Sequence, residues 1–337
     1  LVPVNFKGQI FAKAIDGVDN TVGFETPDGT IVESASQHAK ETHIDFKVPT
    51  TTYQDNNGQD LYANNVNVEL TVTDTYSGIA QIEWSVVAPY DGDNNESGSL
   101  TILNDKSYSP SSNSDGWRQT KQEKNLVTEM KKTLTVRNNS NDIVVKVKMT
   151  DRSGHTSEDE ITFSIDKTTP TIEITYDNNT PDGDFTDYYK ANRTATIVVT
   201  ERNFRPEDVE YVITNTLGER PSLAGWTSRV NRANPDLSTH TATISFTADG
   251  DYTFDMKYQD NARNAAAPVP QQKFTIDKTE PVINVAYSSN DAQNGNYFNT
   301  ARTATISITE RNFETSRIQI TGTATDDGST IAFPEVS

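Results

Sequence analysis

Eight acidic residues stand near the ends of predicted β-strands, in sets that correspond between copies of an internal repeat. The sets are Asp45, Asp74 and Asp151, then Asp166, Glu201 and Asp260, and finally Asp277 with Glu310. Carboxylate oxygens are the ligands that Ca²⁺ prefers, and the ion takes roughly six to eight of them. If each set meets at one place in the fold, with Asn203, Asn261 or Asn264 nearby, the sequence predicts calcium sites at the junctions between domains.

The same acids have a second interpretation that involves no metal. Glu201 can form an ion pair with Arg202, Arg193 or Arg263, and the aspartates at strand ends can cap turns through their own backbone amides. The sequence leaves the choice between calcium and ion pairs open.

Residues that could perform catalysis are sparse. The chain has no cysteine, which excludes thiol chemistry and cysteine-zinc sites, and it has four histidines. These are His38, His43, His155 and His240, and they do not occupy equivalent positions of the repeat. The G-x-S-x-G and H-E-x-x-H motifs and a phosphate-binding glycine loop are missing from the sequence. We therefore expect no enzymatic activity.

A tandem repeat must supply the elements that position the acidic residues. Residues 193–204 return at 302–313 with ten of twelve positions identical, and residues 163–170 return at 274–281 with the pattern Ile-Asp-Lys-Thr-x-Pro. Residues 44–49 match residues 165–170 more weakly, with only the Ile-Asp pair and the final proline in common. A repeat of roughly 110 residues is long enough for each copy to bury its own core. Because proline cannot donate to a strand ladder, we place linkers at about 45–49, 166–170 and 277–281.

The pattern of apolar residues is typical of an all-β protein. In residues 194–200 the side chains of Ala195, Ile197 and Val199 alternate with mostly polar ones, as in a strand with one buried face. Hydrophobic residues make up 33% of the chain, and 17 glycines and 14 prolines separate short runs of this kind. Long apolar helices do not fit this pattern.

Two features favour an immunoglobulin-like sandwich. Leu70 and Trp84, like Ile197 and Tyr211, have the spacing of the strand-B cysteine and the strand-C tryptophan, with apolar residues in place of the disulfide. Residues 249–254, Asp-Gly-Asp-Tyr-Thr-Phe, match the strand-F signature, with Tyr252 as the corner tyrosine.

The linker I-D-K-T-x-P, the strand R-T-A-T-I-x-x-T-E-R-N-F and the corner D-G-D-Y-T-F together resemble the bacterial Ig-like repeats of large Gram-positive cell-surface proteins, of the type found in gut Firmicutes. The resemblance covers most of residues 49–337. It implies tandem immunoglobulin-like β-sandwiches joined by short proline-containing linkers, in a secreted or wall-bound stalk or adhesin. In some gut-bacterial members it implies binding of host proteins such as immunoglobulins.

The repeat and the resemblance together predict four parts. They are residues 1–48, the C-terminal strands of a preceding Ig-like unit; 49–168, an Ig-like domain with an insertion at about 88–115; 169–279, a second Ig-like domain; and 280–337, the N-terminal part of a further unit. We expect the chain to be an excerpt of a longer array, because both ends fall within a repeat.

Two functions remain open. The chain can be a segment of a stalk or adhesin that presents or forms a binding surface, or a module that binds a host protein such as an immunoglobulin or a mucosal glycoprotein. The second function points to a sheet edge or to the non-repeated insertion, where loops that depart from a repeat carry specific function. The candidate binding residues of the insertion are Tyr90, Leu100, Ile102, Leu103 and Tyr108.

The net charge of −19 bears on partners and location. An acidic chain is repelled by nucleic acid and by anionic membrane surfaces, so we expect neither as a partner and no membrane insertion in this segment. A host extracellular protein or glycan is the expected partner class. The resemblance implies an extracellular location at the bacterial cell surface or wall, with attachment through parts outside this chain.

Overall fold

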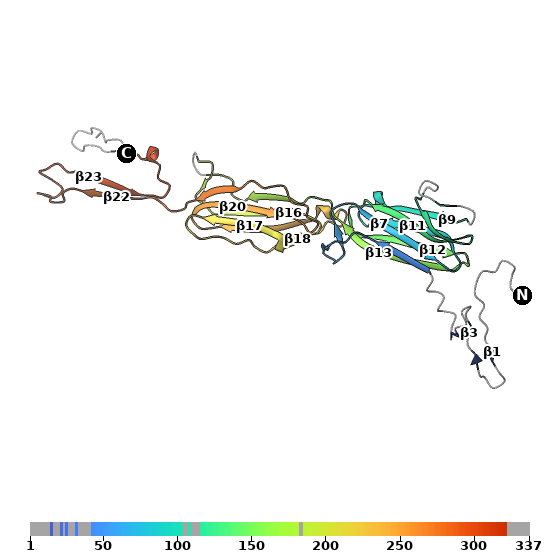
Figure 1. Ribbon diagram of the computed structural model, residues 1–337. Helices are drawn as coiled ribbons and strands as arrows, with labels where there is room; N and C mark the ends of the chain where they lie inside the picture. The colour runs from blue at the N-terminus through green and yellow to red at the C-terminus, as the bar shows by residue number, and fades with distance from the viewer. Residues whose placement is uncertain are drawn as a thin grey trace.

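Two β-sandwiches follow one another along the chain in the computed structural model, and they account for most of the residues that it describes (Figure 1). The described residues are 14–15, 21–22, 24–25, 31–32, 42–103, 107–108, 115–181 and 185–321. No helix within them has the length and apolar character needed to cross a membrane.

The first sandwich packs a four-stranded sheet against a five-stranded one. The four-stranded sheet has the order β10 (Arg118–Glu123), β11 (Leu126–Val136), β7 (Val66–Asp74) and β5 (Thr42–Lys47). The five-stranded sheet has the order β6 (Leu61–Tyr62), β13 (Thr156–Ile165), β12 (Ser140–Asp151), β8 (Ile79–Val87) and β9 (Glu96–Thr101). In immunoglobulin nomenclature, strands A, B, E and D face strands G, F and C.

The second sandwich repeats this order without the extra edge strand. One sheet has the order β14 (Thr171–Tyr176), β16 (Arg193–Thr200), β19 (Thr239–Phe246) and β18 (Thr227–Arg229). The other has the order β15 (Tyr188–Tyr189), β21 (Gln272–Ile276), β20 (Gly250–Tyr258) and β17 (Val209–Asn215).

The remaining elements are short. The paired strands β22 (Val282–Tyr287) and β23 (Ala304–Thr309) follow the second sandwich (Figure 1). Near the N-terminus lie β1 (Ala14–Ile15), β2 (Thr21–Val22), β3 (Phe24–Glu25) and β4 (Ile31–Val32). Single 3₁₀ turns are η2 (Gly92–Asn94), η3 (Pro206–Asp208), η4 (Pro235–Leu237) and η5 (Thr315–Arg317).

Each sandwich has its own apolar core, formed by the inward-facing residues that alternate along each strand. In the second core Ile197 and Phe254 are buried where the disulfide of an immunoglobulin domain would lie. The Tyr252 hydroxyl donates to the carbonyl of Ala248 at 2.9 Å, which is the hydrogen bond of a tyrosine corner. Tyr211 of β17 pairs with Met256 of β20. It remains 40% exposed, because β17 is the edge strand of the second sheet.

The predicted linker at 45–49 is wrong, because its first half is strand β5. Ile44 pairs with Val72 of β7, just as Ile172 of β14 pairs with Val199 of β16. The first sandwich therefore includes residues 42–48, which our division assigned to the preceding unit. A linker copy and an amphipathic edge strand share the same spacing of apolar residues here, and Ile44 is buried in the core of the first sandwich. The rest of the division stays a prediction.

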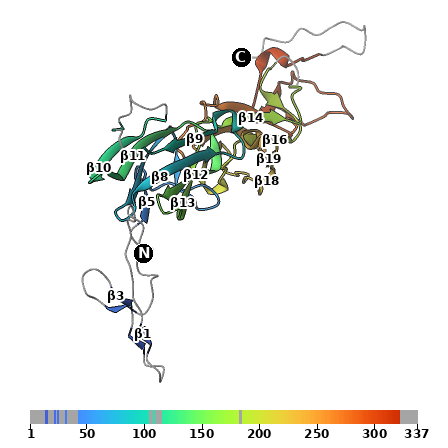
Figure 2. The same cartoon turned by 90° about the vertical axis from the view of Figure 1, so that its right-hand side faces the viewer.

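The insertion of the first sandwich forms a strand of its own. Strand β9 pairs antiparallel with β8 and extends the five-stranded sheet at its edge (Figure 2). Ile102, the residue after β9, is buried in the core of the first sandwich. Part of the insertion therefore belongs to the sheet and core of the first sandwich. The alignment of the repeat shows that residues are inserted, but not how they fold.

Candidate functional site at the junction of the two sandwiches

The side chain of Arg202 joins the two sandwiches. It belongs to the turn after β16, and its Nη2 donates to the carbonyl of Ile165, the last residue of the first sandwich, at 2.9 Å. The same nitrogen lies 3.2 Å from a carboxylate oxygen of Asp166, and Nη1 lies 3.1 Å from Asp236. The next residue, Asn203, donates from Nδ2 to Asp166 Oδ2 at 2.7 Å. We call this set of contacts the arginine clamp.

The loop before β12 and the start of that strand complete the first sandwich's side of the junction. Arg202 Nη1 donates to the carbonyl of Asn139 at 3.1 Å, and Asn139 Nδ2 donates to Asp236 at 3.0 Å. Asn141 Nδ2 donates to Asn203 Oδ1 at 2.7 Å. The second sandwich therefore binds two separate segments of the first, which fixes its orientation more firmly than a linker alone.

The same contacts recur after the second sandwich. Arg311 Nη2 donates to the carbonyl of Ile276 at 3.0 Å and lies 3.7 Å from Asp277, while Asn312 donates to the Asp277 carboxylate. The two most similar segments of the sequence, Ile-Asp-Lys-Thr-x-Pro and Glu-Arg-Asn-Phe, are thus the two halves of one clamp. Their joint repetition has a structural reason.

Three carboxylates meet beside the clamp. Asp166 comes from the linker, Glu201 follows β16 and Asp260 follows β20, because the ends of strands B and F lie at the pole where the linker arrives. All three residues are buried, and a carboxylate oxygen of each lies within 4.8 Å of the others. We call these residues the carboxylate cluster. The structure thus brings together the second of the three sets singled out in the sequence.

Hydrogen bonds orient this cluster but leave one oxygen without a partner. Asp260 accepts from the backbone amide of Asn264 and from its Nδ2, both at 2.8 Å. Glu201 Oε1 accepts from the backbone amide of Asn203 at 2.6 Å, whereas its Oε2 is buried and has no hydrogen-bond partner. The cluster therefore contains an acceptor that no group of the described chain satisfies.

Burial and like charge act on the acids of the cluster. Burial, together with the neighbouring Asp166 carboxylate, raises the pKa of Glu201 to about 8. Burial raises the pKa of Asp260 to about 6, against the opposing effect of the hydrogen bonds from Asn264. The negative charge of this cluster is thus costly when nothing compensates for it.

The expected arginine partners of Glu201 lie elsewhere. Arg202 pairs with Asp166 and Asp236, the Arg193 guanidinium stacks on Tyr189 at 3.8 Å, and Arg263 lies over Tyr53. In the described part of the chain, no arginine forms an ion pair with Glu201. The metal-free interpretation by ion pairing is therefore wrong for this residue.

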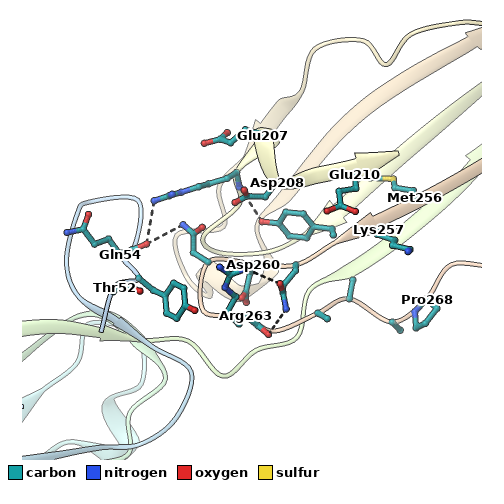
Figure 3. A pocket seen from close by; sticks show the side chains of 18 residues that line it. Thr52, Gln54, Glu207, Asp208, Glu210, Met256, Lys257, Asp260, Arg263 and Pro268 are labelled. Atoms are coloured by element: carbon teal, nitrogen blue, oxygen red, sulfur yellow. Dashed lines mark hydrogen bonds between the residues drawn. The ribbon is translucent and has the colours of Figure 1, made fainter. Parts of the chain in front are cut away.

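A groove of about 890 Å³ opens beside the cluster (Figure 3). The first sandwich lines it with residues 52–54, and the second lines it with most residues of 205–210 and 256–268, including Asp260. Across it, the Gln54 carbonyl accepts from Arg205 Nη2 at 3.4 Å and from Asn261 Nδ2 at 3.2 Å. Residues 52–54 match no sequence motif, so their place in the junction could not be predicted from the repeat.

Comparison with known proteins finds a family match in the C-terminal part. Residues 238–337 match the family model of the bacterial Ig-like domain (group 3). The matched stretch contains Asp260 and the whole second copy of the clamp. Together with the strand order, this match confirms the predicted all-β sandwich fold. The search of curated proteins found no match.

Among the solved structures that this chain matches, two illustrate the level of similarity. One is the tetra-tandem repeat in the extending region of a large adhesion protein, with 15% identity, 90% of this chain and 70% of that chain covered, and a TM-score of 0.35. The other is a marsupial T cell receptor, with 8% identity, 70% of this chain covered and a TM-score of 0.28. This chain spans 62% of the receptor chain. At these scores neither similarity bears on function.

The first predicted set of acids does not assemble as expected. Asp74 and Asp151 lie close together: Ser77 Oγ is 3.4 Å from a carboxylate oxygen of Asp74 and 2.8 Å from one of Asp151. Asp74 also accepts from three backbone amides of the following turn, so it acts as a turn cap. Asp45 is exposed on β5, opposite Thr71, and does not reach them. Its inclusion followed from the wrong linker.

The last predicted set holds only two acids among the described residues. Glu310 Oε1 accepts from the backbone amide of Asn312 at 2.8 Å, as Glu201 does from Asn203, and Asp277 takes the place of Asp166. No described residue supplies a third carboxylate here.

The candidate binding residues of the insertion divide into two groups. Tyr90 and Leu103 are 49% and 50% exposed and are available to a partner. Ile102 is 2% exposed, and Leu100 and Tyr108 pack against the core of the first sandwich. Ile102 was therefore a wrong choice as a binding residue. Leu103 donates its backbone amide to the Tyr108 hydroxyl at 2.8 Å, which gives the latter a structural role.

Proposed function

We propose that this chain is a non-enzymatic segment of a bacterial cell-surface protein, in which Ig-like sandwiches form a stalk or adhesin that holds a binding surface away from the cell. The arginine clamp is the observation that carries the proposal. The family match of residues 238–337 supports the bacterial and modular part of it.

The clamp gives the stalk its stiffness. Arg202 is almost completely buried between its partners, and breaking a buried ion pair by removing one side costs about 3–5 kcal/mol, because the other charge is left without compensation. Pro170 and the short linker restrict bending further. Because the clamp recurs at Arg311, stiffness extends across both junctions.

The extracellular location belongs to the same proposal. The chain has no cysteine and a net charge of −19, which favours solubility and opposes self-association of neighbouring stalks.

Distance measurements between spin labels test the stalk. Because the chain has no cysteine, Glu123→Cys and Arg229→Cys give one label on an exposed position of each sandwich. We expect one narrow distance distribution by double electron–electron resonance, and a broad one when Arg202→Met is added. Arg232→Met, at an exposed position of the same sandwich, is the control and should leave the distribution narrow. A broad distribution in the unmodified junction would refute the stalk.

Binding of a host extracellular protein or glycan is the second candidate function. The exposed Tyr90 and Leu103 favour it, because they lie on the part of the first sandwich that the second lacks. Purified immunoglobulin, mucosal glycoprotein and glycans can be passed over immobilised chain. Retention that is lost in the double variant Tyr90→Ser, Leu103→Ser and kept in Tyr211→Ser, an exposed tyrosine of the second sandwich, would support this function. Absence of retention, or equal retention by all variants, would reject it for this surface.

A further inference from the structure

The electrostatic balance of the carboxylate cluster is incomplete. Asp166, Glu201 and Asp260 carry three negative charges when ionised, and the clamp residue Arg202, 3.2 Å from Asp166, supplies one positive charge. Two negative charges remain in a buried site, where uncompensated charge is expensive. A divalent cation would supply the missing charge.

The geometry of the cluster also points to a ligand. Glu201 is 1% exposed, and its Oε2 has no hydrogen-bond partner although its carboxylate lies within 4.8 Å of both aspartates. Buried polar atoms are nearly always paired, so a single orphan acceptor in a cluster of acceptors needs an explanation. A bound cation provides it, because the oxygen then becomes a ligand.

We propose that one Ca²⁺ ion binds at the junction of the two sandwiches, held by the carboxylates of Asp166, Glu201 and Asp260. Oxygens that bind one Ca²⁺ at about 2.4 Å lie no more than about 4.8 Å apart, which agrees with the spacing of the cluster. Asp166 lies in the linker after the first sandwich and Glu201 follows β16 of the second, so the ion adds to the arginine clamp instead of replacing it.

The chemistry of the donors selects the class of ion. All three side chains offer hard oxygen ligands, and no histidine or cysteine belongs to the group, which disfavours zinc and copper. Mg²⁺ requires near-octahedral geometry at about 2.1 Å, whereas Ca²⁺ accepts longer distances and carboxylates that bind through one or both oxygens, which suits three buried carboxylates.

The surroundings prepare the site for a cation. Asn264 and Asn203 hold the carboxylates through hydrogen bonds, and each carboxylate oxygen keeps a lone pair for a metal. Asp260 lines the groove between the sandwiches, so the groove gives solvent access to the cluster. Waters from the groove can complete the coordination sphere.

Calorimetric titration of the full chain, first treated with a chelator, tests the site. We expect CaCl₂ to bind with one ion per chain, and MgCl₂ to bind at least about tenfold more weakly. Glu201→Gln should weaken Ca²⁺ binding by more than about tenfold, because it removes a ligand charge. Glu207→Gln is the matched control: this exposed acid lines the same groove outside the cluster, and its loss should leave affinity and stoichiometry unchanged.

Thermal unfolding distinguishes a metal ligand from a residue that only supports the fold. Ca²⁺ should raise the melting temperature of the wild type and of Glu207→Gln, but not that of Glu201→Gln. Without Ca²⁺, Glu201→Gln should melt at the same or a higher temperature than the wild type, because glutamine can keep the hydrogen bond from the Asn203 amide and cannot acquire a buried negative charge.

Three results would overturn the proposal. They are the absence of Ca²⁺ binding to the wild type, equal binding by Glu201→Gln, and many weak sites that decrease equally in both variants. The stalk is tested separately, because the spin-label distances can be narrow with or without the ion.

Discussion

Glu201 and Arg202 are neighbours in the chain, but they meet different partners at the junction. Arg202 lies against Asp166 and Asp236 in the clamp, whereas Glu201 faces two other carboxylates and gains no arginine. The difference arises because successive residues of a turn point in different directions. A sequence can therefore place opposite charges side by side without pairing them.

Glu129 of β11 provides a residue whose charge is paired well. Its carboxylate accepts from Thr120 Oγ1 at 2.7 Å and lies 2.6 Å from Lys121 Nζ. The hydrogen bond from Lys121, followed by that from Thr120, lowers the pKa of Glu129 below its ordinary value. The folded state thus favours the ionised form.

We predict that Glu129→Gln lowers the free energy of unfolding at pH 7 by about 2 kcal/mol. An unfolded glutamate takes up its proton near pH 4.5, before the folded one does, so this contribution is present above that pH and is lost as the pH falls through the lower folded pKa. Urea unfolding at pH 7 and pH 3 should show a difference between the variant and the wild type that shrinks on acidification. Glu83→Gln, which breaks an exposed pair with Lys148, should change stability by less than about 1 kcal/mol at either pH.

At the scale of the elements, strands B and F and the second and third linkers followed from the repeat. Their alternation and their turn residues are local properties, and the carboxylates of Asp166, Glu201 and Asp260 met because those strand ends share one pole. The errors at Asp45 and Ile102 have another origin. Whether residues 42–47 form a linker or an edge strand, and whether the insertion folds inward, depends on pairing with β7 and β8, which lies outside the local sequence.

Strand β20 begins at a glycine that the fold cannot replace. Gly250 has φ of 144°, and a Cβ atom there would lie 1.8 Å from Asn215 Oδ1. We predict that Gly250→Ala destabilises the second sandwich by about 3 kcal/mol or more, since both the backbone and the neighbour must move. Chemical unfolding followed by tryptophan fluorescence, to which Trp226 contributes the signal of the second sandwich, measures this. Gly225→Ala, with open space around it, should change stability by less than about 1 kcal/mol, and a similar loss in both variants would contradict the steric cause.

At the scale of the whole molecule, two separate cores are joined by a polar junction. We predict two unfolding transitions in differential scanning calorimetry. Phe254→Ala, which empties part of the second core at a cost of about 3–5 kcal/mol, should lower one transition, and Ile143→Ala, in the first core, should lower the other. A single transition that both variants shift equally would mean that the junction couples the sandwiches into one cooperative unit.

The clamp also determines how such a protein can change its length. A unit with Ile-Asp-Lys-Thr-x-Pro at its end and Glu-Arg-Asn-Phe near its start carries both complementary halves, so unequal recombination can add or delete whole units without redesigning a joint. The first sandwich departs from this rule, because Thr75 stands where the second has Arg202. It can be followed by a unit that carries Glu-Arg-Asn-Phe. It has no arginine of its own at this position to bind the linker of a unit before it. The first sandwich therefore marks one position and one direction in the series of units, because only its C-terminal side can form the arginine clamp.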